Sequence, residues 1–185
     1  MLPSNLVGVY NAFEAARRAG IERVVFASSN HAVGGYELSH GAAAYRGAVL
    51  VDHRSQHWPD SLYGASKLWG EGVGRLYADQ HDLRVLCLRI GACVPHDDWR
   101  AAAIRSKERQ LHLHGDRERL ERYAAMWLSE RDLVQLVERG LSADYRYAIV
   151  YGVSGNPTRF HDLEEARRVL GYVPKDAAVL EEGAA

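Results

Sequence analysis

A basic excess and long apolar runs are both missing from this sequence. Its 23 lysines and arginines nearly balance its 24 aspartates and glutamates, so the chain lacks the positive field that binding to a nucleic-acid backbone requires. No stretch approaches the roughly 18 uncharged apolar residues that span a bilayer, and residues 1–8 lack a basic region followed by an apolar one. We therefore expect a cytoplasmic protein with neither a nucleic-acid partner nor a membrane partner.

Cysteine and lysine are both scarce. The two cysteines, Cys87 and Cys93, lie in or just after an apolar run, and a chain of 185 residues does not need covalent cross-links to be stable. We therefore expect a reducing compartment and no disulfide. Only three lysines are present, at positions 67, 107 and 175, so a motif that contains one of them carries more weight.

What the sequence does contain is typical of one folded domain. Apolar residues make up 47% of the chain and charged residues 25%, close to the averages for globular proteins, which excludes a disordered or fibrous protein. A length of 185 residues supports one hydrophobic core. We expect a single domain over residues 1–185, without internal repeats.

The apolar residues follow two recurrent patterns. Spacings of three and four residues predict amphipathic helices, with Ser4 or Asn5 placed to cap the first helix and Ser129 near the start of the third. Short runs rich in β-branched and aromatic residues predict strands buried on both faces. The expected helices cover residues 5–20, 61–81, 126–141 and 162–170, and the expected strands cover residues 23–28, 84–90 and 147–153.

In two segments the apolar residues follow no sustained periodic spacing. Residues 30–59 hold several glycines and histidines and are expected to form a long irregular connection, which in compact domains is usually functional. Residues 97–121 are dense in charges of both signs, and this balance favours a solvated, partly helical excursion over a binding surface.

The alternation of strands and helices predicts an α/β fold with a parallel sheet. All three expected strands are apolar, so none is expected to be an exposed edge. Three strands make a small sheet for this class, which indicates that part of the sheet is missing.

The most specific motif is Tyr63-Gly64-Ala65-Ser66-Lys67. Tyr63 and Lys67 lie four residues apart in an expected helix and therefore share one face. An ammonium group near a phenol stabilises the phenolate, so the pair predicts a proton acceptor. Because the chain has ten tyrosines, the spacing could also be a coincidence.

Polar side chains follow the first expected strand. Ser28, Ser29, Asn30 and His31 stand where parallel strands end, and ligands of α/β sheets bind at that edge. Hydroxyl groups placed there could meet the phenol of Tyr63. The alternatives are an ordinary strand-ending turn for the two serines and a loop residue bonded to backbone for His31.

Five stretches of the sequence resemble the extended short-chain dehydrogenase/reductase superfamily, specifically its NAD-dependent epimerase/dehydratase group. Within that group, SSNHAVG, RIG, WLSERDL and VYGVSGN are most similar to uronate dehydrogenases and related sugar dehydrogenases that oxidise the anomeric carbon. The resemblance extends across nearly the whole chain. It is carried by NLVGVYNAFEAARRAGIERVVFASSNHAVG, PDSLYGASKLWGE, RVLCLRIGACVP, MWLSERDLVQLVE and YAIVYGVSGN.

The resemblance implies a Rossmann fold, an NAD cofactor, and Ser29, Tyr63 and Lys67 as the catalytic residues. Tyr63 would take the proton from the sugar hydroxyl as hydride leaves for the nicotinamide. Ser29 would hydrogen-bond the substrate oxygen, and Lys67 would hold the nicotinamide ribose. Tyr63, Lys67 and Ile90 would be the cofactor contacts.

The resemblance also implies substrate contacts. Asn30 and His31 match the substrate-contacting pair of the uronate dehydrogenases, and Arg100 is a candidate for their carboxylate-binding arginine, since a guanidinium binds a carboxylate bidentately. Arg100 could equally be a surface arginine. Ala92 stands where those enzymes tend to have a serine, and residues 100–123 are longer than in compact relatives, which leaves the substrate class open. No metal site is expected.

No glycine loop of the G-x-G-x-x-G type follows an opening strand in this chain. In the family that loop cradles the pyrophosphate at a helix N-terminus, so we expect a partial Rossmann-like, doubly wound parallel sheet that lacks the first βαβαβ half. The strand over residues 23–28 would then lose neighbours, which favours a homo-oligomer and weak NAD binding.

The leading hypothesis is an NAD-dependent oxidoreductase acting on a sugar or sugar acid, with the activity of the 185-residue form left open. One alternative is a sugar-nucleotide epimerase of the same superfamily. The other is a non-catalytic sensor or interaction protein that keeps a degenerate fold.

Overall fold

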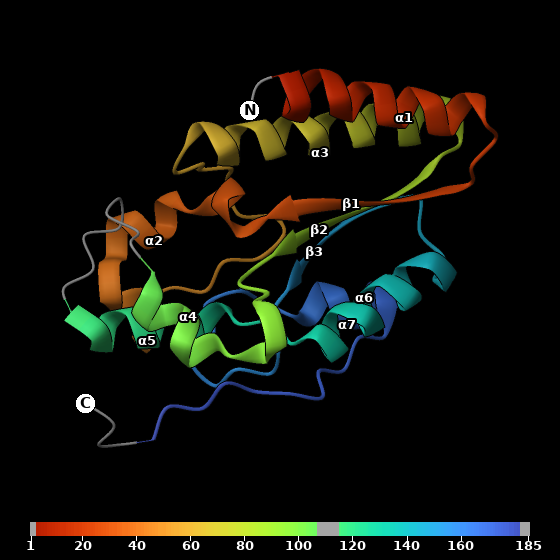
Figure 1. Cartoon of the computed structure of the whole chain (residues 1–185). Helices are drawn as coiled ribbons and strands as arrows, with labels where there is room; N and C mark the ends of the chain where they lie inside the picture. The colour runs from red at the N-terminus through yellow and green to blue at the C-terminus, as the bar shows by residue number, and fades with distance from the viewer. Residues whose placement is uncertain (1–2, 107–114, 182–185) are drawn as a thin grey trace.

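A parallel β-sheet with helices on both faces organises the chain (Figure 1). The computed structural model describes residues 3–106 and 115–181. Within them the sheet has the order β1-β2-β3, and both pairings are parallel. The predicted α/β fold with a parallel sheet is therefore confirmed. The strands are β1 (Arg23–Ser29), β2 (Arg84–Ile90) and β3 (Tyr147–Gly152).

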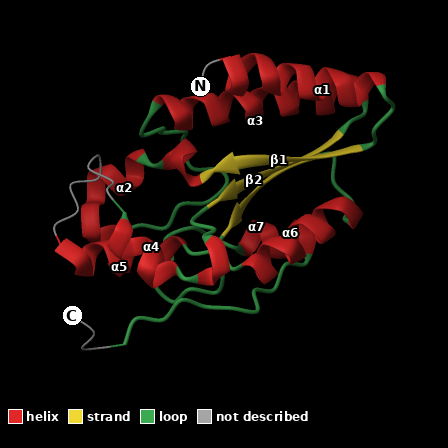
Figure 2. Ribbon diagram, viewed as in Figure 1, coloured by secondary structure: helices red, strands yellow, loops and turns green. Residues whose placement is uncertain are grey.

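The three strands end together. Ser29 pairs with Ile90, and Ile90 pairs with Gly152, so the last residues of the strands form one row across the sheet. Figure 2 shows the three arrowheads pointing to the same side of the molecule, where the segment after β1 begins. The carboxyl edge that binds ligands in α/β sheets is therefore well defined here.

The main helices cover the two faces of the sheet. One face carries α1 (Gly8–Arg18) and α3 (Leu62–His81), and the other carries α6 (Glu130–Ser142) and α7 (Glu164–Leu170) (Figure 1). Ser61 caps α3 by accepting a hydrogen bond from the Gly64 amide at 3.1 Å, and Ser129 caps α6 in the same way. These helices explain why β2, the central strand, is almost wholly buried.

The start of the chain differs from the expectation. A π-helical turn, η1 (Pro3–Val7), precedes α1, and neither Ser4 nor Asn5 caps a helix. Asn5 instead donates a hydrogen bond to the Ser66 hydroxyl on α3 at 2.9 Å. The capping prediction is wrong because this side chain is used in a contact between helices.

The connection after β1 is more regular than predicted. It holds η2 (Asn30–Val33), α2 (Gly35–His40) and η3 (Gly41–Arg46). These elements are too short to show a period in sequence, and they are stabilised by burial of side chains such as Val33, Ala44 and Tyr45. The expectation of an irregular segment over residues 30–59 is therefore wrong for its first half.

The charged segment is partly helical, as expected, and most of its charged residues are exposed or half-buried where the structure describes them. It forms η4 (Pro95–Asp97), α4 (Trp99–Arg105) and α5 (Gly115–Met126), while residues 107–114 lie outside the described residues. Trp99 is buried, and the Arg122 side chain, only 2% exposed, forms an ion pair with Glu37 on α2. The helix expected from residue 126 begins instead at Glu130, because α5 ends at Met126.

Both outer strands, β1 and β3, are edges of the described sheet, although no exposed edge was expected from their apolar sequences; β1 is the strand that was expected to lose neighbours. Within the described residues β1 pairs only with β2, and its side chains from Arg23 to Phe26 are half-buried while Ala27 is exposed. A groove of about 430 Å³ runs between α1 and this edge. Its lining is mostly apolar and consists of Ser4, Gly8, Val9, Ala12, Phe13, Val24, Val25, Phe26, Ala27 and Lys67.

Two further features concern the cysteines and the length of the apolar helices. Cys87 in β2 is buried and Cys93 is exposed, and both are free thiols. In the part of the chain that the structure describes, no helix is both long and apolar enough to cross a membrane.

Candidate active site

Ser29 and the residues after it occupy the carboxyl edge of the sheet. The Ser29 hydroxyl caps η2 by accepting a hydrogen bond from the His31 amide at 3.2 Å, and it donates to the Asn30 side-chain oxygen at 3.2 Å. Asn30 is buried and donates to the Met126 sulfur at 3.0 Å. Ile90 ends β2 beside Ser29. The structure thus gathers Ser29, Asn30, His31 and Ile90 at one edge.

Tyr63 and Lys67 lie in the first two turns of α3. The Lys67 ammonium nitrogen is 5.4 Å from the centre of the Tyr63 ring and donates a hydrogen bond to the Ala27 carbonyl of β1 at 2.9 Å. Burial lowers the pKa of Lys67 below its ordinary value. The ammonium is therefore close enough to act on the phenol, and the phenol itself is partly exposed.

His31 contacts both Ser29 and Tyr63. Its backbone amide bonds Ser29, and its ring packs edge-on against the Tyr63 ring with the centres 5.6 Å apart. Among the described residues, no hydrogen bond joins the Ser29 and Tyr63 hydroxyls directly. His31 is therefore the group that links them.

Asp60, which the sequence analysis missed, lies behind His31. Its carboxylate oxygen Oδ2 is 2.7 Å from His31 Nδ1, and its Oδ1 accepts a hydrogen bond from the Ser61 hydroxyl at 2.7 Å. Burial would raise the pKa of Asp60, but the hydrogen bonds from His31 and Ser61 outweigh it and leave that pKa below the ordinary value. The only sequence signal was an aspartate directly before the cap of the motif helix.

Two glycines allow these segments to approach closely. A Cβ atom added at Gly64 would collide with the His31 carbonyl oxygen, and one added at Gly34 would collide with the Asp60 carboxylate. Gly64, within the Tyr-x-x-x-Lys motif, is therefore required for α3 to pack against the segment that carries His31.

A buried ion pair fixes α3 to the sheet. Arg89 of β2 binds Glu71 of α3 through two hydrogen bonds of 2.9 and 2.8 Å, and both side chains are almost fully buried. Ser28 donates to the same carboxylate at 2.6 Å, and Arg89 also donates to the Tyr151 hydroxyl at 3.1 Å. Ser28, Arg89 and Tyr151 are paired neighbours across the sheet. Ser28 therefore serves this buried cluster rather than meeting the phenol of Tyr63.

Arg100 lies in a different set of contacts. Its guanidinium stacks on the Trp99 ring at 4.5 Å and donates to the Val179 carbonyl at 2.8 Å. Within the described residues it makes no hydrogen bond to Ser29, Asn30 or His31. The structure does not bring this predicted substrate contact together with the others.

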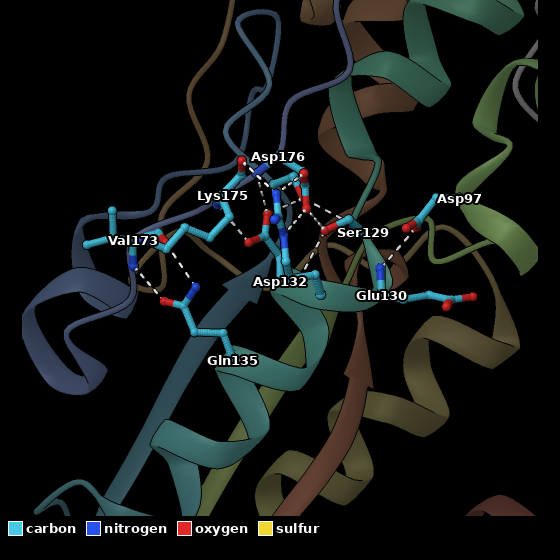
Figure 3. Close-up of polar contacts among 10 residues, drawn as sticks. Asp97, Ser129, Glu130, Asp132, Gln135, Val173, Lys175 and Asp176 are labelled. Atoms are coloured by element: carbon cyan, nitrogen blue, oxygen red, sulfur yellow. Dashed lines mark hydrogen bonds and ion pairs between the residues drawn. The ribbon is translucent and has the colours of Figure 1, made fainter.

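The segment after α7 is bound along α6 (Figure 3). The buried Asp132 carboxylate accepts hydrogen bonds from the Lys175 and Asp176 amides at 2.7 and 3.2 Å and from the Ser154 hydroxyl at 2.6 Å. The Ser129 hydroxyl donates to Asp176 at 2.7 Å. The WLSERDL and VYGVSGN stretches thus contact each other, and these residues hold the C-terminal segment in place.

The site has the groups to hold one end of NAD. Lys67 reaches the groove beside β1, with Tyr63 adjacent to it, and an ammonium and a phenol suit a ribose with its hydroxyl groups. A glycine loop for the pyrophosphate is absent from the sequence. No group of three or more His, Cys, Asp or Glu side chains in residues 3–106 and 115–181 could hold a metal ion.

Comparison with known sequences identifies relatives over nearly the whole chain. It is 40% identical over 179 residues to the NAD-dependent glucose-6-phosphate dehydrogenase of Haloferax volcanii, a match that covers 95% of this chain and 62% of that protein. It is 37% identical over 179 residues to the uronate dehydrogenase of Pseudomonas putida, covering 96% of this chain and 55% of that protein. The chain therefore spans less than two thirds of the length of these relatives.

A solved structure has the same fold. A mutant uronate dehydrogenase from Agrobacterium tumefaciens, complexed with NAD, superposes with a TM-score of 0.71 at 31% sequence identity, covering 94% of this chain and 54% of that one. A family model described as the NAD dependent epimerase/dehydratase family matches residues 1–95 of the 185. The fold, the relatives and this match agree with the resemblance seen in sequence: the chain belongs to the NAD dependent epimerase/dehydratase family.

Proposed function

We propose that this chain carries the substrate side of an NAD-dependent dehydrogenase that oxidises a sugar or sugar acid at its anomeric carbon. The observation that carries the proposal is the placement of Lys67 beside Tyr63, with His31 joining Tyr63 to Ser29 at the carboxyl edge of the sheet. The names of the relatives, which are glucose-6-phosphate and uronate dehydrogenases, support the same reaction class.

The chain's own residues would supply the proton chemistry and the positioning. The Tyr63 phenolate, stabilised by the Lys67 ammonium, accepts the proton of the sugar hydroxyl. The Ser29 hydroxyl exchanges its bond to Asn30 for one to the same sugar oxygen. Tyr63, Lys67 and Ile90 hold the ribose end of the cofactor, and NAD, when bound, supplies the hydride acceptor.

The substrate is proposed as a small sugar held by Ser29, Asn30 and His31. A carboxylate on that sugar would require Arg100 to leave the Val179 carbonyl, and Ala92 offers no hydroxyl. We therefore propose the broader class of sugars and sugar acids rather than uronates alone.

The cellular setting is also a proposal. The balanced charge and the scarcity of cysteine support a cytoplasmic protein that acts on a small molecule, with no nucleic-acid or membrane partner. The open edge of β1 supports a homo-oligomer.

A second candidate is a protein that binds a sugar without turning it over. The observation that favours it is the β1 groove, which is open beside Lys67 where a dehydrogenase needs an enclosed cofactor. Binding without reduction of NAD would support this candidate.

The test is formation of NADH by the purified chain with excess NAD and a panel of sugars: D-glucuronate, D-glucose 6-phosphate and L-arabinose. We expect NADH with at least one of them, and its loss in the Tyr63→Phe variant. The Tyr10→Phe variant, which removes a phenol from α1 outside the site, is the control. Sugar binding without formation of NADH would contradict the dehydrogenase proposal and favour a protein that binds a sugar without turning it over.

A further inference from the structure

The His31–Asp60 pair is enclosed on one side and open on the other. The Asp60 side chain is 5% exposed, whereas the His31 side chain is 31% exposed. Nδ1 of the imidazole faces Asp60 at 2.7 Å, so the nitrogen with its hydrogen-bonding capacity left over is Nε2. Nε2 is therefore the ring nitrogen that remains available to a ligand on the partly exposed His31 side chain. The same ring packs against Tyr63.

The hydrogen bonds of Asp60 indicate which ring nitrogen of His31 carries the hydrogen. A carboxylate only accepts hydrogen bonds, and hydrogen bonds from His31 and Ser61 hold the pKa of Asp60 below its ordinary value despite burial. An ionised Asp60 therefore requires a hydrogen on Nδ1 of His31. In the neutral imidazole Nε2 is then an acceptor with an available lone pair.

Asp60 is itself held by the start of α3. Its other oxygen accepts from the Ser61 hydroxyl, and that hydroxyl accepts from the Gly64 amide at 3.1 Å. Close packing of Gly34 against the Asp60 carboxylate leaves it little freedom. The chain of contacts therefore fixes the orientation of His31 relative to the helix that carries Tyr63.

We propose that Asp60 is a positioning residue that holds His31 in the tautomer with hydrogen on Nδ1, so that Nε2 accepts a hydrogen bond from a sugar hydroxyl beside Tyr63. The tautomer is inferred from the contact between Asp60 and Nδ1 of His31, and the sugar contact rests on the proposed function. Asp60 acts only through His31. The role resembles that of any buried carboxylate that sets the tautomer of a neighbouring imidazole.

The direct test is nitrogen-15 NMR of the His31 ring in the unmodified chain at about pH 9, above the ordinary titration range of imidazole. We expect a protonated Nδ1 and an unprotonated Nε2. In the Asp60→Ala variant the hydrogen should move to Nε2 in a substantial fraction of molecules, because the acceptor at Nδ1 is lost. If that variant does not fold, the tautomer measured in the unmodified chain is by itself the test.

A matched control is Asp79→Ala, which removes one carboxylate from α3, the helix that begins just after Asp60, and breaks an exposed pair with Arg75. It should leave the His31 resonances unchanged. A wild-type ring with hydrogen on Nε2, or a folded Asp60→Ala variant with an unchanged tautomer, would overturn the proposal.

Addition of D-glucuronate and of L-arabinose separates this inference from the proposed function. A shift of the Nε2 resonance on adding either sugar supports the contact. The expected tautomer without any response to the sugars would keep the positioning role of Asp60 and reject the sugar contact, and with it the proposed substrate site.

Discussion

At the scale of single residues, the site depends on groups that act through a neighbour. The Lys67 ammonium lies 5.4 Å from the centre of the Tyr63 ring, and Asp60 contacts His31, whose ring in turn contacts Tyr63. The substitutions are therefore expected to differ in which of two properties they affect, the rate of sugar oxidation or the affinity for NAD, and this difference separates the roles.

Tyr63→Phe should lower the rate of sugar oxidation by about 10²–10⁴-fold, the usual contribution of a positioned acid or base. The phenylalanine ring keeps the packing against His31, so the affinity for NAD should change little. Initial rates and calorimetric titration with NAD check both expectations. An unchanged rate would show that another group accepts the proton.

Lys67→Ala should damage both properties, because its ammonium is placed to act on the phenol and to hold the cofactor's ribose. We expect a lower rate and weaker NAD binding in the same variant. If only the rate fell, Lys67 would have no cofactor contact. Lys175→Ala is the control, since its side chain lies outside the site.

Asp60→Asn should make stability depend less on pH in the acid range. The pKa of Asp60 lies below its ordinary value in the folded chain, so its carboxylate stabilises the fold fully above the ordinary carboxyl pKa of about 3.9, and this contribution is lost as the pH falls through the lower pKa of the folded chain. Loss of a charged hydrogen bond costs about 1.5–3 kcal/mol near neutral pH. Urea unfolding at several pH values should show the gap between the two proteins closing in acid. A gap that is constant with pH would contradict the assigned ionisation.

At the scale of elements, the position of α3 decides whether the site exists. The Glu71–Arg89 pair joins this helix to β2, and Ser28 and Tyr151 extend the contact to the strands on either side. The packing of Gly64 against the His31 carbonyl fixes the start of the same helix.

Glu71→Gln should lower the free energy of unfolding by about 3–5 kcal/mol, because Arg89 would remain buried without a compensating charge. Asp79→Asn, which breaks the exposed pair with Arg75 on the same helix, should lower it far less, because solvent screens that pair. Urea unfolding measures both. Equal effects would mean that the buried pair does not anchor α3.

The regular elements could be predicted from sequence because their signals are local. Strand β2 is a continuous apolar run, and α3 and α6 begin at serine caps. The short elements after β1 were missed because tertiary contacts such as the Tyr45–Glu37 hydrogen bond stabilise them. Of the site, Ser29, Tyr63 and Lys67 could be found by motif. Asp60 and Glu71 could not, since their partners lie 29 and 18 residues away and are joined only by the fold.

At the scale of the whole molecule, the open edge of β1 is the dominant feature. An apolar edge strand with unpaired backbone groups recruits another chain. The groove between this edge and α1 adds apolar side chains to the same surface. We therefore expect the 185-residue chain to self-associate.

Light scattering tests the association. Ala27→Lys places a charge at the exposed lining of the groove and should reduce the associated fraction, whereas Ala15→Lys, on the exposed surface of α1 outside the groove, should not. A monodisperse monomer at high concentration would contradict the expected association through the open edge.

The most direct test of the central claim follows the hydride itself. The purified chain is incubated with saturating NAD and, in turn, D-glucuronate, D-glucose 6-phosphate and L-arabinose, each deuterated at the anomeric carbon, and the reduced nicotinamide is analysed by mass spectrometry. The account predicts that with at least one sugar the deuterium appears in the reduced cofactor, and that Tyr63→Phe abolishes the transfer. Reduced cofactor without deuterium, or none with any of the three sugars, would contradict it.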